Sequence, residues 1–327
     1  MSTISLPLNH TQSEQLRPLN IMRDLSDVAD LVELCFQSAM DNDGRRYIQQ
    51  MRDASRDNRF LRWASTSIEQ TSMPLSGYIW EEDKRIVGNI SLVPFTQNRK
   101  RIYLLSNIAV HPDYRRRSIA QQLTSMGMEH ARNRRAASIW LHVRDDNFSA
   151  IKLYSNLGFK KHSRRTTWRT DLLPIPESVL YSAKITPRPG RFWRQQLQWL
   201  QRAYSDEITW YRMPNWETFG TSLRYWLYRF FVENDIRQWS VEQDGHLQGV
   251  VSWMQTRTRT TPLWLATAPH ADTTAISELL LHARRHLSAQ RRELTLNYPA
   301  DEMTEALESA GFVPRHTLLW MVADGAK

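Results

Sequence analysis

The sequence predicts a mixed α/β (α+β) fold made of two tandem halves. Segments that alternate as strands do are interleaved with segments whose apolar residues recur at helical spacing. The order of these segments restarts after a proline-containing stretch, and Gly311-Phe312 near the end mirrors Gly158-Phe159. The length of 327 residues suits two domains. We therefore expect a diverged tandem duplication with a repeat of roughly 150 residues.

In the first half, a strand is followed by two helices, a hairpin and further strands and helices. Ser26 is placed to cap the first helix, with Asp27 and Asp30 near its positive end. The apolar run over 102–110 is typical of a strand covered on both faces. The other expected elements are strands over 16–23, 77–81, 86–93, 138–143, 159–161 and 166–170, and helices over 44–56, from the basic loop to about Asn133, and over 147–157.

The second half repeats this order. Asp244-Gly245 between two alternating runs predicts a hairpin, and Gly249 in its second strand parallels Gly88. Each half ends in a strand that contains a tryptophan, Trp168 or Trp320. The expected elements are helices over 192–203, 216–231, 273–287 and 301–310, and strands over 238–243, 247–254, 263–267 and 293–298.

Composition and charge exclude several classes of protein. Lys and Arg number 43 against 34 Asp and Glu, and this net charge of +9 favours anionic ligands. The single cysteine, Cys35, excludes a disulfide framework and a cysteine-based metal site, and it favours the reducing cytoplasm. No apolar run is long enough for a membrane helix. His282 and His286 have metal-ligand spacing, but arginines lie between them, so no metal is predicted.

One motif suits a phosphate group. The segment 106–120 combines a strand, a turn and the start of a helix, where backbone N–H groups and the helix dipole favour an anion. Arg115, Arg116 and Arg117 add positive charge, while the small residues Ser118 and Ala120 allow close approach to the backbone. A solvated basic helix start remains the alternative interpretation.

A second motif follows. The segment 140–159 reads as a strand, a capped helix and a strand, with Asn147 as the expected N-cap. Tyr154 lies seven residues later, two turns along the same helix face. A polar cap and a phenol on one face could line a ligand groove. A helix with a buried tyrosine is the alternative.

Together these motifs resemble the GCN5-related N-acetyltransferase (GNAT) family. The family loop Arg/Gln-x-x-Gly-x-Gly/Ala is matched here from Arg115 to Ala120, with Ser118 in place of the first glycine. The family's next motif stands here as Asn147, Ala150, Leu153, Tyr154, Gly158 and Phe159. The segment from Asn107 to Val110 also resembles the branch that acetylates protein N-termini.

The resemblance implies two tandem GNAT-like domains, each a mixed, mostly antiparallel central sheet flanked by helices. It implies an acetyl-CoA-binding domain over 16–171 and a degenerate GNAT-like domain over 185–327. The composition adds the expectation of a tail over 1–15 and a proline-containing linker over 172–184. The implied function is acetyl transfer to a primary amine, in a small molecule or a protein N-terminus, by direct attack with Tyr154 as general acid. The implied acetyl-CoA contacts are Ile108, Ala109, Val110, Arg115, Arg116, Arg117, Ser118, Ile119, Ala120, Asn147 and Tyr154.

The sequence departs from the family pattern at the phosphate loop, at the general base and in the second half. If the position of Ser118 requires positive φ, serine adds strain of order 1 kcal/mol. The strand over 102–110 contains no carboxylate, so a general base could be Glu81, Glu82 or a water chain, or the amine could arrive neutral. In the second half, alignment on prolines puts Asp272 opposite Arg115, and alignment on Gly311-Phe312 puts Leu307 opposite Tyr154.

The partners expected from sequence are an amine acceptor and no membrane, with the protein a monomer or a homodimer. The arginines at 132, 134, 135, 164 and 165 carry no nucleic-acid module signature, so they predict a solvated basic face. The rival hypothesis is a non-catalytic acyl-CoA-binding or nucleic-acid-associated protein. Release of thiol that depends on an acceptor separates the two hypotheses.

Overall fold

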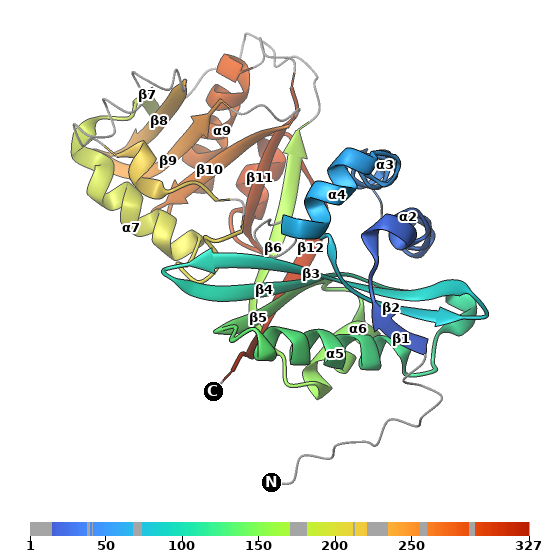
Figure 1. Cartoon of the computed structure of the whole chain (residues 1–327). Coiled ribbons are helices and arrows are strands. Elements are labelled where there is room, and N and C mark those ends of the chain that lie inside the picture. The colour runs from blue at the N-terminus through green and yellow to red at the C-terminus, as the bar shows by residue number, and fades with distance from the viewer. Residues whose placement is uncertain are drawn as a thin grey trace, which may run out of the picture. The chain divides into compact units, whose positions relative to one another are not determined.

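The computed structural model describes residues 15–37, 40, 42–67, 74–170, 182–211, 213–220, 235–255, 260–287 and 292–326. The chain forms two compact units (Figure 1). Unit 1 comprises Met1–His162 and Trp320–Lys327, and unit 2 comprises Ser163–Leu319. Both contain strands and helices in the predicted alternation, which confirms the mixed α/β class.

Unit 1 contains a mixed sheet in the order β1-β2-β3-β4-β5. The first four strands pair antiparallel, and β4 pairs parallel with β5, so the sheet is mostly antiparallel as predicted. Its elements are β1 (Leu16–Pro18), α2 (Ile21–Phe36), α3 (Asn42–Arg56), α4 (Asn58–Ser67), β2 (Ser76–Glu82), β3 (Arg85–Gln97), β4 (Lys100–Val110), η3 (Pro112–Tyr114), α5 (Ile119–Asn133), β5 (Ser138–Arg144), α6 (Phe148–Asn156) and the start of β6 (Lys160–Thr170).

Helices cover both faces of this sheet. Figure 1 shows α2, α3 and α4 on one side of β3 and β4 and α5 on the other. A Cβ on Gly88 would lie 2.9 Å from Ile119 Cγ2, so glycine allows α5 to approach β3 closely. The opposite face is closed by an apolar core that joins α2 to α3 and α4 and includes Leu25, Ile48 and Leu61.

The first helix begins earlier than predicted. Its N-cap is Asn20 rather than Ser26, and the Asn20 side chain accepts a hydrogen bond from the Met22 N–H at 3.1 Å. The buried Asp24 accepts from the Asn20 N–H at 2.8 Å and so closes the first turn from the other side. Two polar caps therefore begin the helix five residues ahead of the serine, and the preceding strand is confined to Leu16–Pro18.

Unit 2 has the strand order β12-β6-β11-β10-β9-β8-β7. Its helix α7 contacts β9 through Gln196 and Ser252, while α9 packs on the other face, against Gly249. Its elements are β6, β7 (Lys184–Pro187), η4 (Gly190–Phe192), α7 (Trp193–Ala203), η5 (Trp216–Phe219), β8 (Ile236–Gln243), β9 (His246–Met254), β10 (Thr261–Thr267), α9 (Thr273–Leu287), β11 (Leu294–Pro299), α10 (Thr304–Ser309) and the start of β12 (Phe312–Asp324).

Local features of the two halves repeat. Gly249 meets Ile276 of α9 as Gly88 meets Ile119 of α5. Gly158 and Gly311 both follow a short helix with positive φ, at 94° and 73°. These correspondences support the predicted tandem organisation.

The boundary between the two units falls within strands β6 and β12. Strand β6 begins in unit 1 and continues in unit 2, whereas the end of β12, from Trp320 onward, belongs to unit 1. Of the predicted tail over 1–15, residues 1–14 lie outside the described residues, and so do residues 172–181 of the predicted linker over 172–184. The division into 16–171 and 185–327 stays a prediction about the repeat.

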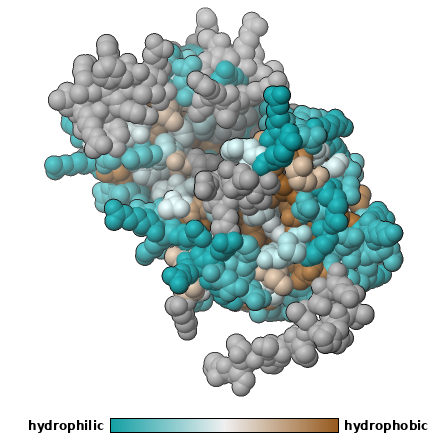
Figure 2. All heavy atoms as spheres, in the orientation of Figure 1, coloured by the Kyte–Doolittle hydropathy of each residue, from teal (hydrophilic) through white to brown (hydrophobic). Residues whose placement is uncertain are grey.

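Two further features bear on earlier expectations. Of the helix predicted over 216–231, the part over 216–219 is a 3-10 turn, and 221–234 lies outside the described residues. Among the described helices, none is long and apolar enough to cross a membrane. On the face shown in Figure 2, hydrophilic side chains predominate, with smaller apolar areas between them.

Candidate functional site

Strand β4 parts from β5 halfway along its length. The paired residues run from Ile102 with Ser138 to Leu105 with Leu141, and beyond them these two fully described strands are no longer in register. Residues 102–105 of β4 are buried, whereas Ser106, Asn107 and Ile108 are half-buried. The segment 106–110 therefore offers backbone groups along an edge that β5 does not cover, as the family resemblance implies for Ile108, Ala109 and Val110.

A β-bulge marks the point of separation. Ser91 pairs with Ser106 and Asn89 pairs with Ala109, so two residues of β4 lie opposite one residue of β3. One of the two, Asn107, has a φ of +49°. The bulge turns β4 away from its former direction, which explains why pairing with β5 ends here.

The basic loop leads from this strand to α5. Arg115, Arg116, Arg117 and Ser118 are all exposed. The Arg115 Nε donates to the Val110 carbonyl at 3.3 Å, so the start of the loop is held against the end of β4. The Arg117 guanidinium lies over the Tyr114 ring, 4.9 Å from its centroid.

The first turn of α5 has no side-chain cap. Ser118 occupies the N-cap position with a φ of 60°, and its hydroxyl makes no capping hydrogen bond. The N–H groups at the start of this helix, including those of the buried Ile119 and of Ala120, have no acceptor within the helix. Loop charge and helix start thus present positive potential at one place, which suits a phosphate group.

The left-handed φ of Ser118 gives a testable consequence. Ser118→Gly should increase the free energy of unfolding by up to about 1 kcal/mol, because glycine adopts this conformation without a Cβ clash. Urea denaturation measures the change. The matched control is Ser155→Gly at an exposed position of α6, which should lower stability by roughly 0.5–1 kcal/mol. Equal destabilisation by both substitutions would show that Ser118 is unstrained.

Helix α6 carries the second motif. Asn147 is its N-cap, as predicted, and its Oδ1 accepts from the Ala150 N–H at 3.2 Å. Tyr154 on the same helix is buried, with its ring 6.1 Å from that of Phe159. Burial raises the pKa of Tyr154 above its ordinary value near 10, so the phenol holds its proton at neutral pH.

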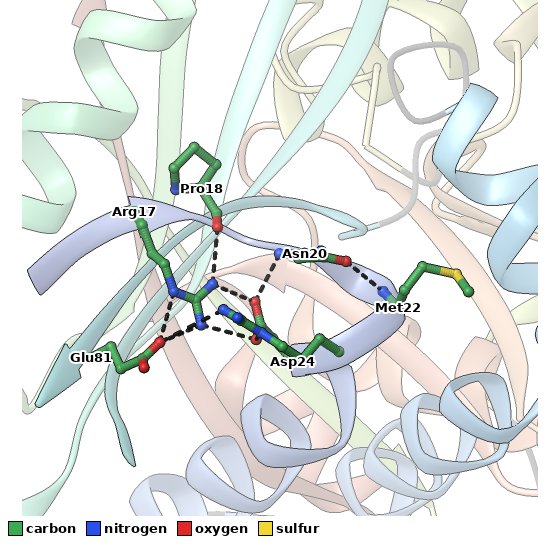
Figure 3. A network of polar contacts seen from close by, with 7 residues as sticks. Arg17, Pro18, Asn20, Met22, Asp24 and Glu81 are labelled. Atoms are coloured by element: carbon green, nitrogen blue, oxygen red, sulfur yellow. Dashed lines mark hydrogen bonds and ion pairs between the residues drawn. The ribbon is translucent and has the colours of Figure 1, made fainter. Parts of the chain in front are cut away.

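The two carboxylates considered as bases are both engaged by arginines. Arg17 binds Glu81 through its Nε at 2.7 Å and Asp24 through its Nη1 at 2.6 Å, as Figure 3 shows. Burial alone would raise the pKa of Asp24, but hydrogen bonds from Arg17 and Arg23 outweigh it and lower that pKa. This network joins β1, α2 and β2. Glu82 lies 3.6 Å from Arg117.

Sequence reasoning missed two neighbours of this region. Trp320, which β12 brings into unit 1, contacts the His142 ring in a tilted arrangement with ring centroids 3.9 Å apart. His142 is the first β5 residue beyond the paired part. The Cys35 thiol donates to the Val110 carbonyl at 3.3 Å. These contacts join residues far apart in sequence, and no local motif indicates them.

In unit 2 the corresponding opening is filled by tyrosines. Strands β10 and β11 are in register only as far as Leu263 and Leu296. Beyond that point the Tyr204 hydroxyl accepts from the Leu265 N–H at 3.4 Å, and the Tyr298 hydroxyl bonds Thr267 Oγ1 at 3.1 Å. Both tyrosines are fully buried. The backbone edge that unit 1 leaves uncovered is therefore occupied here by side chains of the chain itself.

The helix start of unit 2 is also occupied. Asp272 Oδ1 accepts from the Ala275 N–H at 2.9 Å and caps α9. The loop before α9 is shorter than the loop before α5, so Asp272 stands at the N-cap, the place of Ser118, and the predicted correspondence with Arg115 is wrong. Leu307, on α10, is fully buried in the apolar core.

The histidine pair forms an aromatic cluster. The rings of His282 and His286 are tilted against each other with centroids 4.0 Å apart, and both rings contact Trp239. Burial, and then the nearby His286 and Arg285, lower the pKa of His282 to about 4. Within the described ranges, no group of three potential metal ligands occurs.

Comparison with known proteins agrees with this geometry. Residues 33–159 match the acetyltransferase (GNAT) family. The ribosomal protein bS18-alanine N-acetyltransferase of Escherichia coli K12 is 39% identical over 64 residues, which cover 20% of this chain and 43% of that protein. The enzyme of the same name from Salmonella typhimurium LT2 is 38% identical over 82 residues, which cover 25% and 55%. The chain thus spans about half the length of these curated relatives.

A solved structure extends the likeness to the whole fold. The GCN5-related N-acetyltransferase from Sphaerobacter thermophilus superposes with a TM-score of 0.58 at 16% identity. The match covers 95% of this chain and 96% of that chain. At this identity the match shows the fold alone.

Proposed function

We propose, on the premise that residues 33–159 belong to the acetyltransferase (GNAT) family, that the chain transfers an acetyl group from acetyl-CoA to a primary amine. The observation that carries the proposal is the separation of β4 from β5 beside the uncapped start of α5. An extended pantetheine chain needs an uncovered strand edge. A pyrophosphate needs N–H groups and positive charge. Unit 1 offers both at adjoining positions.

The residues present fit acetyl-CoA. Arg115, Arg116 and Arg117 are exposed on one loop, and the N–H groups of Ile119 and Ala120 lie directly after it. These groups would hold the pyrophosphate. The segment 108–110 would hold the pantetheine arm through its backbone, and Asn147 would remain the cap that fixes the start of α6. When bound, acetyl-CoA supplies an acetyl group activated as a thioester.

Each step of the proposed acetyl transfer is assigned to a chemical group of unit 1. A β4 backbone N–H at the bulge donates to the acetyl carbonyl oxygen, where negative charge develops during attack. The amine attacks directly, so no nucleophilic side chain is required. The Tyr154 hydroxyl gives its proton to the departing sulfur, and the raised pKa ensures that the phenol is protonated beforehand. Glu81 is hydrogen-bonded to Arg17, and Glu82 lies beside the loop arginine Arg117. Neither is assigned as the base, and the amine arrives neutral or loses its proton to water.

Unit 2 is assigned a supporting role in this scheme. Tyr204 and Tyr298 fill its opening, and Asp272 occupies the helix start with a carboxylate. A pyrophosphate at this helix start would be repelled by the Asp272 carboxylate, which already interacts favourably with the helix dipole. We therefore assign one acetyl-CoA to each chain, bound in unit 1.

The acceptor is proposed by similarity. The curated relatives are named as alanine N-acetyltransferases of ribosomal protein bS18. The proposed acceptor class is accordingly a primary amine such as a protein N-terminus, and the proposed place of action is the cytoplasm.

Thiol release tests the proposal. Purified chain is incubated with acetyl-CoA and a panel of amines that includes amino acids and peptides with a free N-terminal alanine, and free CoA is followed with a thiol reagent. We expect thiol release to depend on a free amine and to stop when the same peptide is acetylated beforehand. Acetyl-CoA binding with no amine-dependent release from any acceptor would support the rival, a non-catalytic acyl-CoA-binding protein.

A further inference from the structure

A buried polar cluster lies beside the β4 bulge, on the sheet face that α3 covers. Its members on the sheet are Asn89, Ser91, Ser106 and Asn107, and its member on α3 is Tyr47. Asn89 and Ser91 are almost completely buried. A polar group of this size inside an otherwise apolar face requires an explanation, because burying polar atoms is unfavourable unless they are hydrogen-bonded.

Two oxygens of this cluster lack a donor. Asn89 Oδ1 and Ser106 Oγ are buried, and neither has a hydrogen-bond partner among the residues described in the structure. Ser106 is paired with Ser91 across β3 and β4 and lies on the same face of the sheet. Asn89 lies two residues from Ser91 on the same strand face. The two oxygens therefore belong to side chains on the same face of the sheet. The bulge brings the Asn107 side chain to this face as well, where it contacts Ser91 and Tyr47 of α3.

The orientation of Asn89 is fixed by its backbone partner. Its Nδ2 donates to the Asn107 carbonyl oxygen at 2.9 Å, and a carbonyl can only accept. The amide oxygen must therefore be the atom without a donor. The rest of the cluster already has partners, since Asn107 Nδ2 donates to the Tyr47 hydroxyl at 2.6 Å and to Ser91 Oγ at 3.2 Å.

We infer that Asn89 Oδ1 and Ser106 Oγ bind the amino group of the acceptor. The ligand that two acceptor oxygens need is one with several N–H donors on one atom, which describes a primary amine, protonated or neutral. The inference rests on the proposed function, because Asn107 belongs to the bulge whose backbone faces the acetyl carbonyl in that scheme. The cluster would hold the amine within reach of the reacting carbon.

The half-buried Tyr47 supplies the entrance. Its hydroxyl accepts from the Asn107 amide at 2.6 Å, and in the inferred site the amine would enter past this side chain of α3. A site of this kind discriminates strongly against ligands without the amino group, because the two oxygens then stay without donors.

The test measures peptide binding rather than turnover. The probe is a hexapeptide with a free N-terminal alanine and a fluorophore at its C-terminus, and its acetylated twin lacks the amine. Both are titrated by anisotropy against the full chain saturated with CoA. The variants are Asn89→Leu and the milder Ser106→Ala. The matched control is Ser240→Ala, which truncates a fully buried serine in β8 of unit 2.

We expect wild type and Ser240→Ala to bind the free-amine peptide about tenfold or more tighter than its twin. Asn89→Leu should abolish this preference and Ser106→Ala should reduce it severalfold, with the acetyl-CoA affinity unchanged. A preference that survives in Ser106→Ala and in folded Asn89→Leu would overturn the inference, and so would a wild type with no preference. Amine preference without thiol release would leave the inference standing and contradict the proposed function instead.

Discussion

Tyr154→Phe should lower kcat by about 100-fold or more, the typical cost of losing a general acid. The substitution removes one hydroxyl from a buried ring that packs against Phe159, so packing and fold should persist. The affinity for acetyl-CoA, measured by calorimetry, should change little, because the phenol acts when the sulfur leaves. Steady-state thiol release with a good amine acceptor gives kcat.

The pKa of Tyr154 also predicts how the rate depends on pH. Burial raises the pKa of Tyr154 above 10, so its protonated, active form persists through the alkaline range. The rate should therefore rise with pH as the amine loses its proton, with no decline from phenol ionisation below pH 10. The control is Tyr78→Phe, which removes a half-buried hydroxyl from β2 that is bonded to His130. Equal kcat values for Tyr154→Phe and Tyr78→Phe would remove Tyr154 from the mechanism.

Arg115→Glu should weaken acetyl-CoA binding by roughly tenfold or more. The reversal replaces an attraction to the pyrophosphate by a repulsion at the same place. Arg115 is exposed, and its Nε donates to the Val110 carbonyl at 3.3 Å in a contact at the protein surface, so the fold should tolerate the change. Titration calorimetry measures the dissociation constant directly.

The control for this reversal is Arg194→Glu. Arg194 is an exposed arginine on α7 of unit 2, so the substitution changes the net charge equally. It should leave the affinity within about twofold of wild type. If both reversals weaken binding alike, the effect belongs to the overall charge of the protein, and the loop does not hold the phosphates.

The local elements could be predicted because their signals are short-range. The hairpin around Asp244-Gly245 and the helix Thr273–Leu287 stand where the sequence places them. Asn147 caps α6 as its position before an apolar run indicates. Ser26 failed as a cap because Asn20 and Asp24 begin the same helix earlier, and the apolar stripe does not show which polar residue prevails.

The features that decide function at the site depend on contacts between distant residues. Tyr204, directly after α7, and Tyr298 on β11 close the opening of unit 2, and they are far apart in sequence. Trp320 reaches His142 because the last strand returns to unit 1. Asn89 looks like an ordinary strand residue until its register with the bulge is known. None of these contacts leaves a periodic or local signal.

A crystal structure of the full chain with CoA tests the central claim most directly. The account predicts one CoA in each chain, with its pantetheine arm beside the 108–110 segment of β4 and its pyrophosphate at the N–H groups of Ile119 and Ala120. It also predicts that Tyr204 and Tyr298 remain in place in unit 2. CoA bound beside Asp272, or bound away from β4 in unit 1, would contradict it.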